Sequence, residues 1–134
     1  MEQELVINNL NLKAGKCVDI TGDIPKDSKC FAINLGKDCC NLVLHFNPRF
    51  DHLGDVNTIV CNSKDAEAWG EEQRECAFPY QQGDKVEVCI HFDKEELTMK
   101  LPKGQEIKFP NRLGLETVNF LSVEGFHLKS LKLD

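Results

Sequence analysis

The chain has 134 residues, with 22 acidic and 16 basic side chains and a formal net charge of −6. This length predicts one domain, spanning residues 1–134, with enough buried surface to fold without a metal or a disulfide. The acidic charge argues against nucleic acid as a partner, because phosphate binding needs a basic surface. No apolar run is long enough to cross a bilayer, so we expect no membrane insertion.

Seven cysteines are the unusual feature of this composition. An odd number cannot close completely into disulfides, and no two of them have the C-x-x-C spacing of zinc or thioredoxin-like sites. The N-terminal residues are polar and acidic, without the basic and apolar regions of a signal peptide. We therefore expect free thiols and synthesis in the reducing cytosol, with Cys17, Cys30, Cys61 and Cys89 in or near the core.

Apolar and polar residues alternate along much of the chain. The alternating stretches are residues 29–35, 41–46, 86–92, 97–101 and 107–109. Turn signals separate them at residues 14–15, 24–27, 36–38, 82–84, 102–104 and 124–125. Alternation of period two predicts strands that bury one face, and many short strands indicate an antiparallel sandwich or barrel. The one helical turn that we expect spans residues 65–69 and ends at Gly70.

A row of polar side chains falls on one face of a predicted strand. His45, Asn47 and Arg49 lie at positions i, i+2 and i+4, so an extended chain directs all three to one side. Pro48 interrupts the row, and because proline has no backbone N–H we expect this strand end to be an edge or a bulge. An imidazole, a carboxamide and a guanidinium together can both donate hydrogen bonds to hydroxyl groups and accept them.

A second polar row follows at residues 69–74. It begins with Trp69, the only tryptophan, and continues with Glu72 and Arg74, which share a face if the segment is extended. A carboxylate beside guanidinium groups stays ionised and accepts hydrogen bonds. Asn62, on an alternating stretch between the two rows, adds another amide. An apolar ring among such groups predicts a sugar site, in which the ring packs on the C–H face of a pyranose.

At these residues the sequence resembles the galectins. The motifs that carry the resemblance are HFNPRF at 45–50, VCNS at 60–63 and WGEEQR at 69–74, with FPNRL at 109–113 in support. The resemblance implies one carbohydrate-recognition domain with a two-sheet antiparallel jelly-roll fold. Such a domain binds β-galactosides such as lactose and N-acetyllactosamine without a metal or other cofactor. It also implies a homodimer, formed through the terminal strands, that crosslinks galactosides on glycoproteins and glycolipids.

The resemblance further implies how galactose itself is held. His45 and Arg49 would contact the axial 4-hydroxyl, with assistance from Asn47. Trp69 would stack on the face of the galactose ring. Asn62 would contact the region of the 6-hydroxyl.

The same resemblance assigns the remaining polar groups. Glu72 would contact the 6-hydroxyl region and, with Arg49 and Arg74, the 3-hydroxyl of a neighbouring glucose or N-acetylglucosamine. Asp55 resembles the family acid that orients these arginines. No residue is expected to ligate a metal, because the spacings of the four histidines match no ligand motif.

One loop departs from the family pattern. The family usually has a histidine directly before Gly-Asp, whereas Leu53 occupies that place here and His52 lies one residue earlier. A shift of one residue in a strand turns the side chain to the other face. We therefore expect galactose binding to be kept and the preference beyond the galactose ring to be altered.

Two other classes of protein remain as alternatives. A cytosolic lipid-binding β-barrel has nearly the same length but carries two helices near its N-terminus, whereas residues 16–36 alternate here and contain Pro25. A glycosidase needs two carboxyl groups that flank the scissile bond, and only Glu72 is well placed. We therefore favour a lectin and expect no enzyme.

The galectin resemblance also has a consequence for the cysteines. Galectins leave the cell without a signal peptide, so the resemblance implies both a cytoplasmic and an extracellular location. Reduced thiols would then meet an oxidising exterior, and we expect sugar binding to decay there without a reductant. Cys39 and Cys40, in a predicted turn, are the thiols that we expect to react first.

Overall fold

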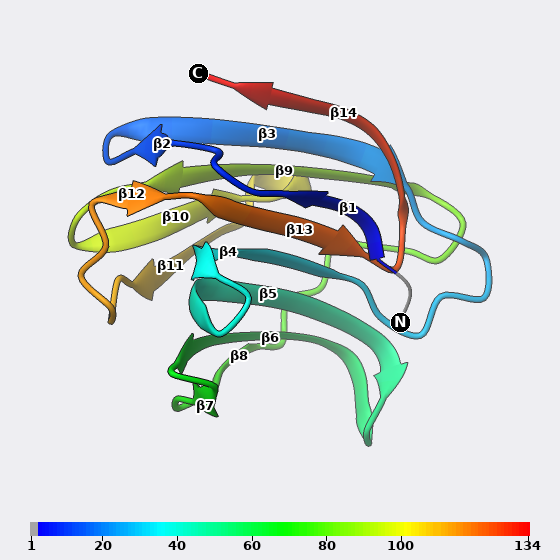
Figure 1. Ribbon diagram of the computed structural model, residues 1–134. Coiled ribbons are helices and arrows are strands. Elements are labelled where there is room, and N and C mark those ends of the chain that lie inside the picture. The colour runs from blue at the N-terminus through cyan, green and yellow to red at the C-terminus, as the bar shows by residue number, and fades with distance from the viewer. Residues whose placement is uncertain (1–2) are drawn as a thin grey trace.

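The computed structural model describes residues 3–134, which form two antiparallel β-sheets packed face to face (Figure 1). The seven-stranded sheet contains, in spatial order, β1 (Gln3–Ile7), β13 (Phe120–Glu124), β4 (Ala32–Asp38), β5 (Asn41–His52), β6 (Asp55–Asp65) and β7 (Ala68–Trp69). Its remaining strand, β8 (Gln73–Glu75), also pairs with β6. The predicted all-β jelly-roll sandwich is confirmed.

The second sheet has five strands and carries the C-terminus at its edge (Figure 1). Its spatial order is β11 (Glu106–Pro110), β10 (Glu96–Lys100), β9 (Lys85–Phe92), β3 (Lys16–Asp23) and β14 (His127–Leu133). A short pair, β2 (Leu12–Lys13) with β12 (Thr117–Val118), and a 3-10 turn, η1 (Pro102–Gly104), complete the regular structure. Within residues 3–134 no helix has the length and apolar character needed to span a bilayer.

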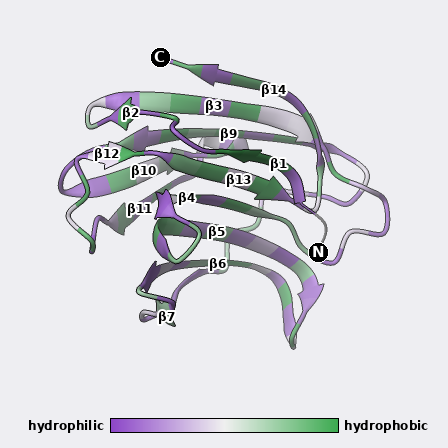
Figure 2. Cartoon of the chain, in the orientation of Figure 1, coloured by the Kyte–Doolittle hydropathy of each residue, from purple (hydrophilic) through white to green (hydrophobic). Residues whose placement is uncertain are grey.

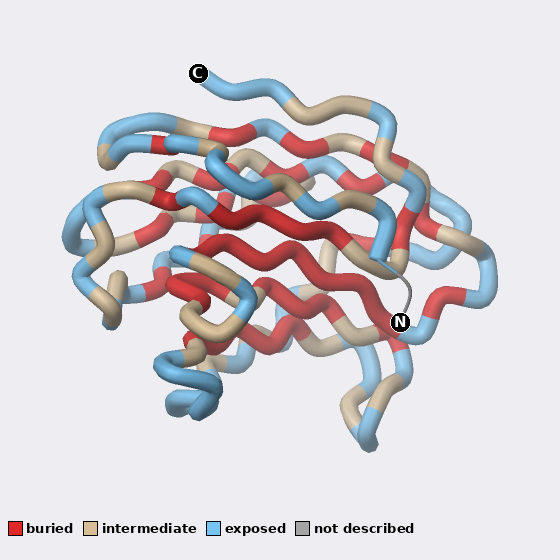
Figure 3. The backbone as a smooth tube through the Cα atoms, in the orientation of Figure 1, coloured by how far each residue is buried: buried red, intermediate tan, exposed pale blue. Residues whose placement is uncertain are grey.

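The alternating apolar residues meet between the two sheets. Hydrophobic and hydrophilic positions alternate along the strands (Figure 2), and the central strands β13, β4 and β5 are buried over most of their length (Figure 3). Phe31 lies at the centre of an aromatic group, with its ring centroid 5.2 Å from Tyr80 and 5.4 Å from Phe126. This packing supplies the rigid support on which β5 and β6 present their outer face.

The cysteines occupy three kinds of environment. Cys30 and Cys61 are buried, Cys17 and Cys89 are half-buried, and Cys39 and Cys76 are exposed. Cys40 is half-buried in the β4–β5 turn beside Cys39, and hydrogen bonds with Cys39 and with Glu67 raise its pKa to about 11. The thiolate is the reactive form, so exposure favours Cys39 and Cys76 over Cys40 as reactive groups.

Residues 65–69 form the tip of a β-hairpin, so the predicted helical turn is wrong. Ala66 and Glu67 have φ values of 50° and 71°, the left-handed pair of a two-residue turn between antiparallel strands. The Ala66 N–H donates to Asn41 Oδ1 at 2.8 Å, and the Glu67 N–H donates to the Cys40 carbonyl at 2.9 Å. Contacts with the neighbouring β4–β5 turn thus hold this segment as a hairpin tip.

Pro48 lies inside the sheet, so the prediction that it ends at an edge or a bulge is wrong. It is buried in β5, which pairs with β6 without a break from His45 to His52. Its carbonyl accepts the Phe31 N–H at 3.1 Å, but proline has no N–H to return to the Phe31 carbonyl. Asn47 Nδ2 makes that bond instead, at 2.8 Å. A side-chain amide therefore replaces the missing backbone donor and lets β5 continue.

This compensation generates a double-mutant test. Asn47→Ala leaves the buried Phe31 carbonyl without its donor and should lower the free energy of unfolding by about 1–3 kcal/mol. Adding Pro48→Ala restores a backbone N–H, so part of that loss, about 1 kcal/mol, should return only in the Asn47→Ala background. Urea unfolding of the wild type, both single variants and the double variant measures the coupling. Additive effects would contradict the role assigned to Asn47.

Candidate functional site

The two polar rows meet on the outer face of β5 and β6. A hollow of about 380 Å³ is lined there by His45, Arg49, Val60, Asn62, Trp69, Gly70 and Glu72. Five of the six residues assigned to sugar binding from the sequence thus lie around one hollow. Asn47, the sixth, is only 4% exposed and lies beneath this surface. In the structure it supports the site: besides bonding to Phe31, it accepts a hydrogen bond from Arg49 Nε at 3.0 Å.

Asp55 joins the two arginines of the site. Its carboxylate oxygens contact Arg49 Nη1 at 2.6 Å and Arg74 Nη1 at 2.5 Å. Arg74 Nη2 in turn contacts Glu72 Oε1 at 2.8 Å. Arg74 and then Arg49 hold the pKa of Asp55 below its usual value, so the bridge stays ionised well into acidic conditions. Both guanidinium groups are therefore oriented before any ligand arrives.

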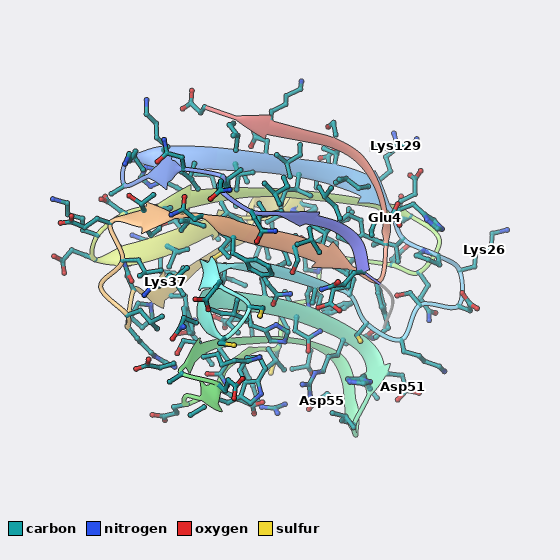
Figure 4. The ribbon with its side chains drawn as sticks, viewed as in Figure 1. Glu4, Lys26, Lys37, Asp51, Asp55 and Lys129 are labelled. Carbon is teal, nitrogen blue, oxygen red and sulfur yellow. The ribbon has the colours of Figure 1, made fainter. Side chains whose placement is uncertain are left out.

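The hairpin between β5 and β6 brings Asp55 to this position, and Figure 4 labels Asp51 and Asp55 near its tip. Leu53 and Gly54 form the turn with φ values of 50° and 84°, and the Leu53 side chain is 79% exposed. These two positive φ values are those of a two-residue turn between antiparallel strands, as at Ala66 and Glu67. His52 is half-buried at the end of β5, pairs with Asp55 across the hairpin and is not among the residues that line the hollow.

His45 presents a neutral imidazole to the hollow at neutral pH. Burial is the main cause that lowers its pKa to about 4, and the charges of Arg49 and Lys64 act in the same direction. Its Nδ1 atom lies 2.6 Å from Asn34 Oδ1, and its ring centroid lies 4.9 Å from that of Trp69. The ring is therefore held by Asn34 from the neighbouring strand β4 and by Trp69, with the remaining nitrogen available to a ligand.

Trp69 is the exposed aromatic surface that the sequence predicted. Its side chain is 51% exposed, and Lys64 Nζ lies 4.6 Å from the ring centroid, which helps to hold the ring in place. The next residue, Gly70, packs closely against its neighbours. A Cβ atom at this position would lie 2.9 Å from Ser63 Oγ and 3.0 Å from Arg112 Nη1. Only glycine fits at this position without a shift of its neighbours.

The structure adds two residues to which the sequence assigned no role. Arg112 Nη1 donates to the Glu71 carbonyl at 2.7 Å and contacts Ser63 Oγ at 3.2 Å and Asn62 Oδ1 at 3.4 Å. Arg112 thereby connects the β7–β8 segment to β6. In the sequence it was noted only as part of the FPNRL motif. Asn34, which lies beside His45 on β4, could not be recognised from the sequence, because it looks like one polar residue in an alternating strand.

Comparison with known proteins agrees with this geometry. The family profile described as "Galactoside-binding lectin" matches residues 4–133. The chain belongs to this family. It is 60% identical to galectin-1 of Bos taurus over 131 residues, which cover 97% of each chain.

Solved structures give the same result. A toad ovary galectin in complex with thio-digalactose has a TM-score of 0.97, 50% identity and full coverage of both chains. CG-16, a homodimeric agglutinin from chicken liver, has a TM-score of 0.94 and 53% identity, with 97% of this chain and 98% of that chain covered. Because this is a family of lectins, the prediction that the protein is not an enzyme is confirmed.

The neutral His45 gives this lectin a pH-dependent stability. In the unfolded chain the imidazole has its ordinary pKa of about 6.5, so the unfolded state takes up a proton between pH 6.5 and about 4 while the folded state does not. The neutral His45 therefore leaves the free energy of unfolding at its full value above pH 6.5, and this free energy decreases as the pH falls from 6.5 to about 4. His45→Gln should remove about 1–3 kcal/mol of the stability difference between pH 7 and pH 4.5, measured by urea unfolding. The exposed His127→Gln serves as control, and an unchanged pH dependence in His45→Gln would contradict this assignment.

Proposed function

We propose that this lectin binds β-galactosides of the lactose and N-acetyllactosamine type in the hollow on β5 and β6, without a metal ion. The observation that carries the proposal is the convergence of the Trp69 ring, the neutral His45 imidazole, the Arg49 guanidinium and the Glu72 carboxylate on a single hollow, with Arg49 held by Asp55 and Glu72 by Arg74. The toad ovary galectins whose structures match this chain are complexes with thio-digalactose and with N-acetylgalactose. Among residues 3–134 there is no cluster of three metal-ligating side chains.

The arrangement suits galactose because its 4-hydroxyl is axial. We place that hydroxyl between His45 and Arg49, where it donates to the imidazole and accepts from the guanidinium. The apolar face of the ring packs on Trp69. Glu72, held by Arg74, accepts from hydroxyl groups at the border of galactose and the next sugar. A shallow polar site of this kind gives weak affinity for one disaccharide, because desolvation of polar groups offsets much of the gain.

We further propose a homodimer formed through the terminal strands. CG-16, at 53% identity, is homodimeric, and β1 and β14 lie at the edges of the two sheets here. The exposed residues Val6 (42%) and Leu133 (50%) lie on these edges. A bulge between Leu128 and Ser130 shifts the register of β14 against β3. Two sites per dimer would crosslink galactosides on glycoproteins and glycolipids by avidity.

Sedimentation velocity at micromolar concentration should give twice the monomer mass, and a single monomer species would contradict the dimer.

We propose the same dual location that the sequence led us to expect, cytoplasmic and extracellular. The exposed Cys39 and Cys76 thiols support a protein made in a reducing compartment. Appearance in the medium of expressing cells should persist when the secretory pathway is blocked. Loss of the protein from the medium under that block would contradict the proposal.

A lactose titration tests the galactoside proposal directly. Trp69 is the only tryptophan, so its fluorescence should shift and saturate as lactose binds. Glu72→Gln removes the partner of Arg74 and should weaken binding about tenfold or more, or about 1.4 kcal/mol. Glu95→Gln, which removes the same charge from an exposed turn, should bind like the wild type. A flat titration of the folded wild type would overturn the proposal.

Leu53 generates a separate prediction about specificity. Because it replaces a polar family residue with an exposed apolar one beside Asp55, we propose that it alters the preference beyond the galactose ring. Glycan-array profiles of the wild type and Leu53→His should differ among extended galactosides while both retain lactose binding. Leu53→Ala controls for the loss of the leucine alone. Identical wild-type and Leu53→His profiles would refute this role.

A further inference from the structure

A chain of polar side chains runs beside the candidate site on the same face of the sheet, from β13 through β4 to His45. Asn34 is 6% exposed and Ser122 is 1% exposed. Asn34 Nδ2 lies 3.0 Å from Ser122 Oγ and 3.0 Å from Glu124 Oε1, while Asn34 Oδ1 lies 2.6 Å from His45 Nδ1. These three contacts use the whole amide of a side chain that does not line the hollow.

Glu124 sets the orientation of this amide. An ionised carboxylate accepts hydrogen bonds and has no proton to donate. The atom of Asn34 that faces Glu124 must therefore be the nitrogen, which places the amide oxygen toward His45. A flipped amide would set its oxygen against the carboxylate and its N–H groups against the imidazole.

The amide oxygen in turn decides which nitrogen of His45 carries the proton. A carbonyl oxygen only accepts, so His45 Nδ1 must donate across the 2.6 Å contact. The charged groups around the ring are Arg49 on β5, Lys64 on β6, Glu72 before β8 and, beyond Asn34, Glu124 on β13. The two cations and the burial of the ring oppose a second proton. The imidazole therefore keeps its single proton on Nδ1.

We infer that Asn34 is a positioning residue that holds His45 in the Nδ1–H tautomer, so that the Nε2 lone pair faces the sugar. The inference rests on the proposed galactoside binding. A hydroxyl placed between His45 and Arg49 then has one acceptor and one donor. In the other tautomer both groups would donate, and the hydroxyl proton would be left without a partner. The carboxamide is suited to this task because a carboxylate at position 34 would stabilise the imidazolium, which has no lone pair.

The first test needs no sugar. Long-range ¹H–¹⁵N correlation spectra of the sugar-free wild type at pH 7 report the protonation of both ring nitrogens of each histidine, and comparison with His45→Gln identifies the His45 signals. We expect a protonated Nδ1 and an unprotonated Nε2. A protonated Nε2, or a mixture of the two tautomers, would overturn the inference.

The second test uses the pH dependence of lactose binding. Asn34→Asp places a carboxylate against Nδ1 and should raise the pKa of His45, so binding should fail at a pH higher by about one unit or more than in the wild type. Asn9→Asp, which adds the same charge on an exposed turn, is the matched control and should keep the wild-type profile. A purely structural role for Asn34 would weaken binding equally at all pH values, and that result would contradict the tautomer assignment.

The outcomes separate this inference from the proposed function. If folded wild-type protein binds no lactose at pH 7, the proposed function fails, while the nitrogen spectra still decide the tautomer. If the wild type binds lactose and Asn34→Asp keeps its pH midpoint, the inference alone fails. If Asn34→Asp does not fold, the spectra of the wild type remain the deciding measurement.

Discussion

The site depends on one carboxylate that holds two guanidinium groups. Asp55 contacts Arg49 at 2.6 Å and Arg74 at 2.5 Å, and Arg74 then holds Glu72 at 2.8 Å. Single ion pairs at a surface contribute little to stability, but a network of this kind fixes the geometry of long side chains. Their donors and acceptors are oriented before binding, so the sugar does not have to order them.

Other polar contacts add support from neighbouring segments. Asn47 connects Arg49 to the Phe31 carbonyl, Arg112 ties the β7–β8 connection to Asn62, and Asn34 connects His45 to β13. Each contact links a side chain at or near the hollow to a neighbouring segment. The groups that we propose contact the sugar are thus positioned by buried amides and by a guanidinium, on a sheet whose other face packs against an apolar core.

Much of this arrangement could be predicted from the sequence, and the errors have physical causes. Alternation predicted the strands because one face of each is buried, and the spacing of His45, Asn47 and Arg49 predicted their common face. The turn at Ala66 was misjudged because its N–H groups bind a turn distant in sequence, at Asn41 and Cys40. Pro48 was misjudged because the compensating Asn47 amide is visible only in three dimensions. Asn34 was missed because its partners come from another strand.

The central claim is that this surface selects the axial 4-hydroxyl of galactose by placing it between an acceptor on His45 and a donor on Arg49. Methyl β-lactoside and methyl β-cellobioside differ only in the configuration at that hydroxyl, so calorimetric titration of the wild-type protein with both isolates its contribution. We expect saturable binding of the lactoside and no measurable binding of the cellobioside. Equal affinity for the two sugars would contradict it.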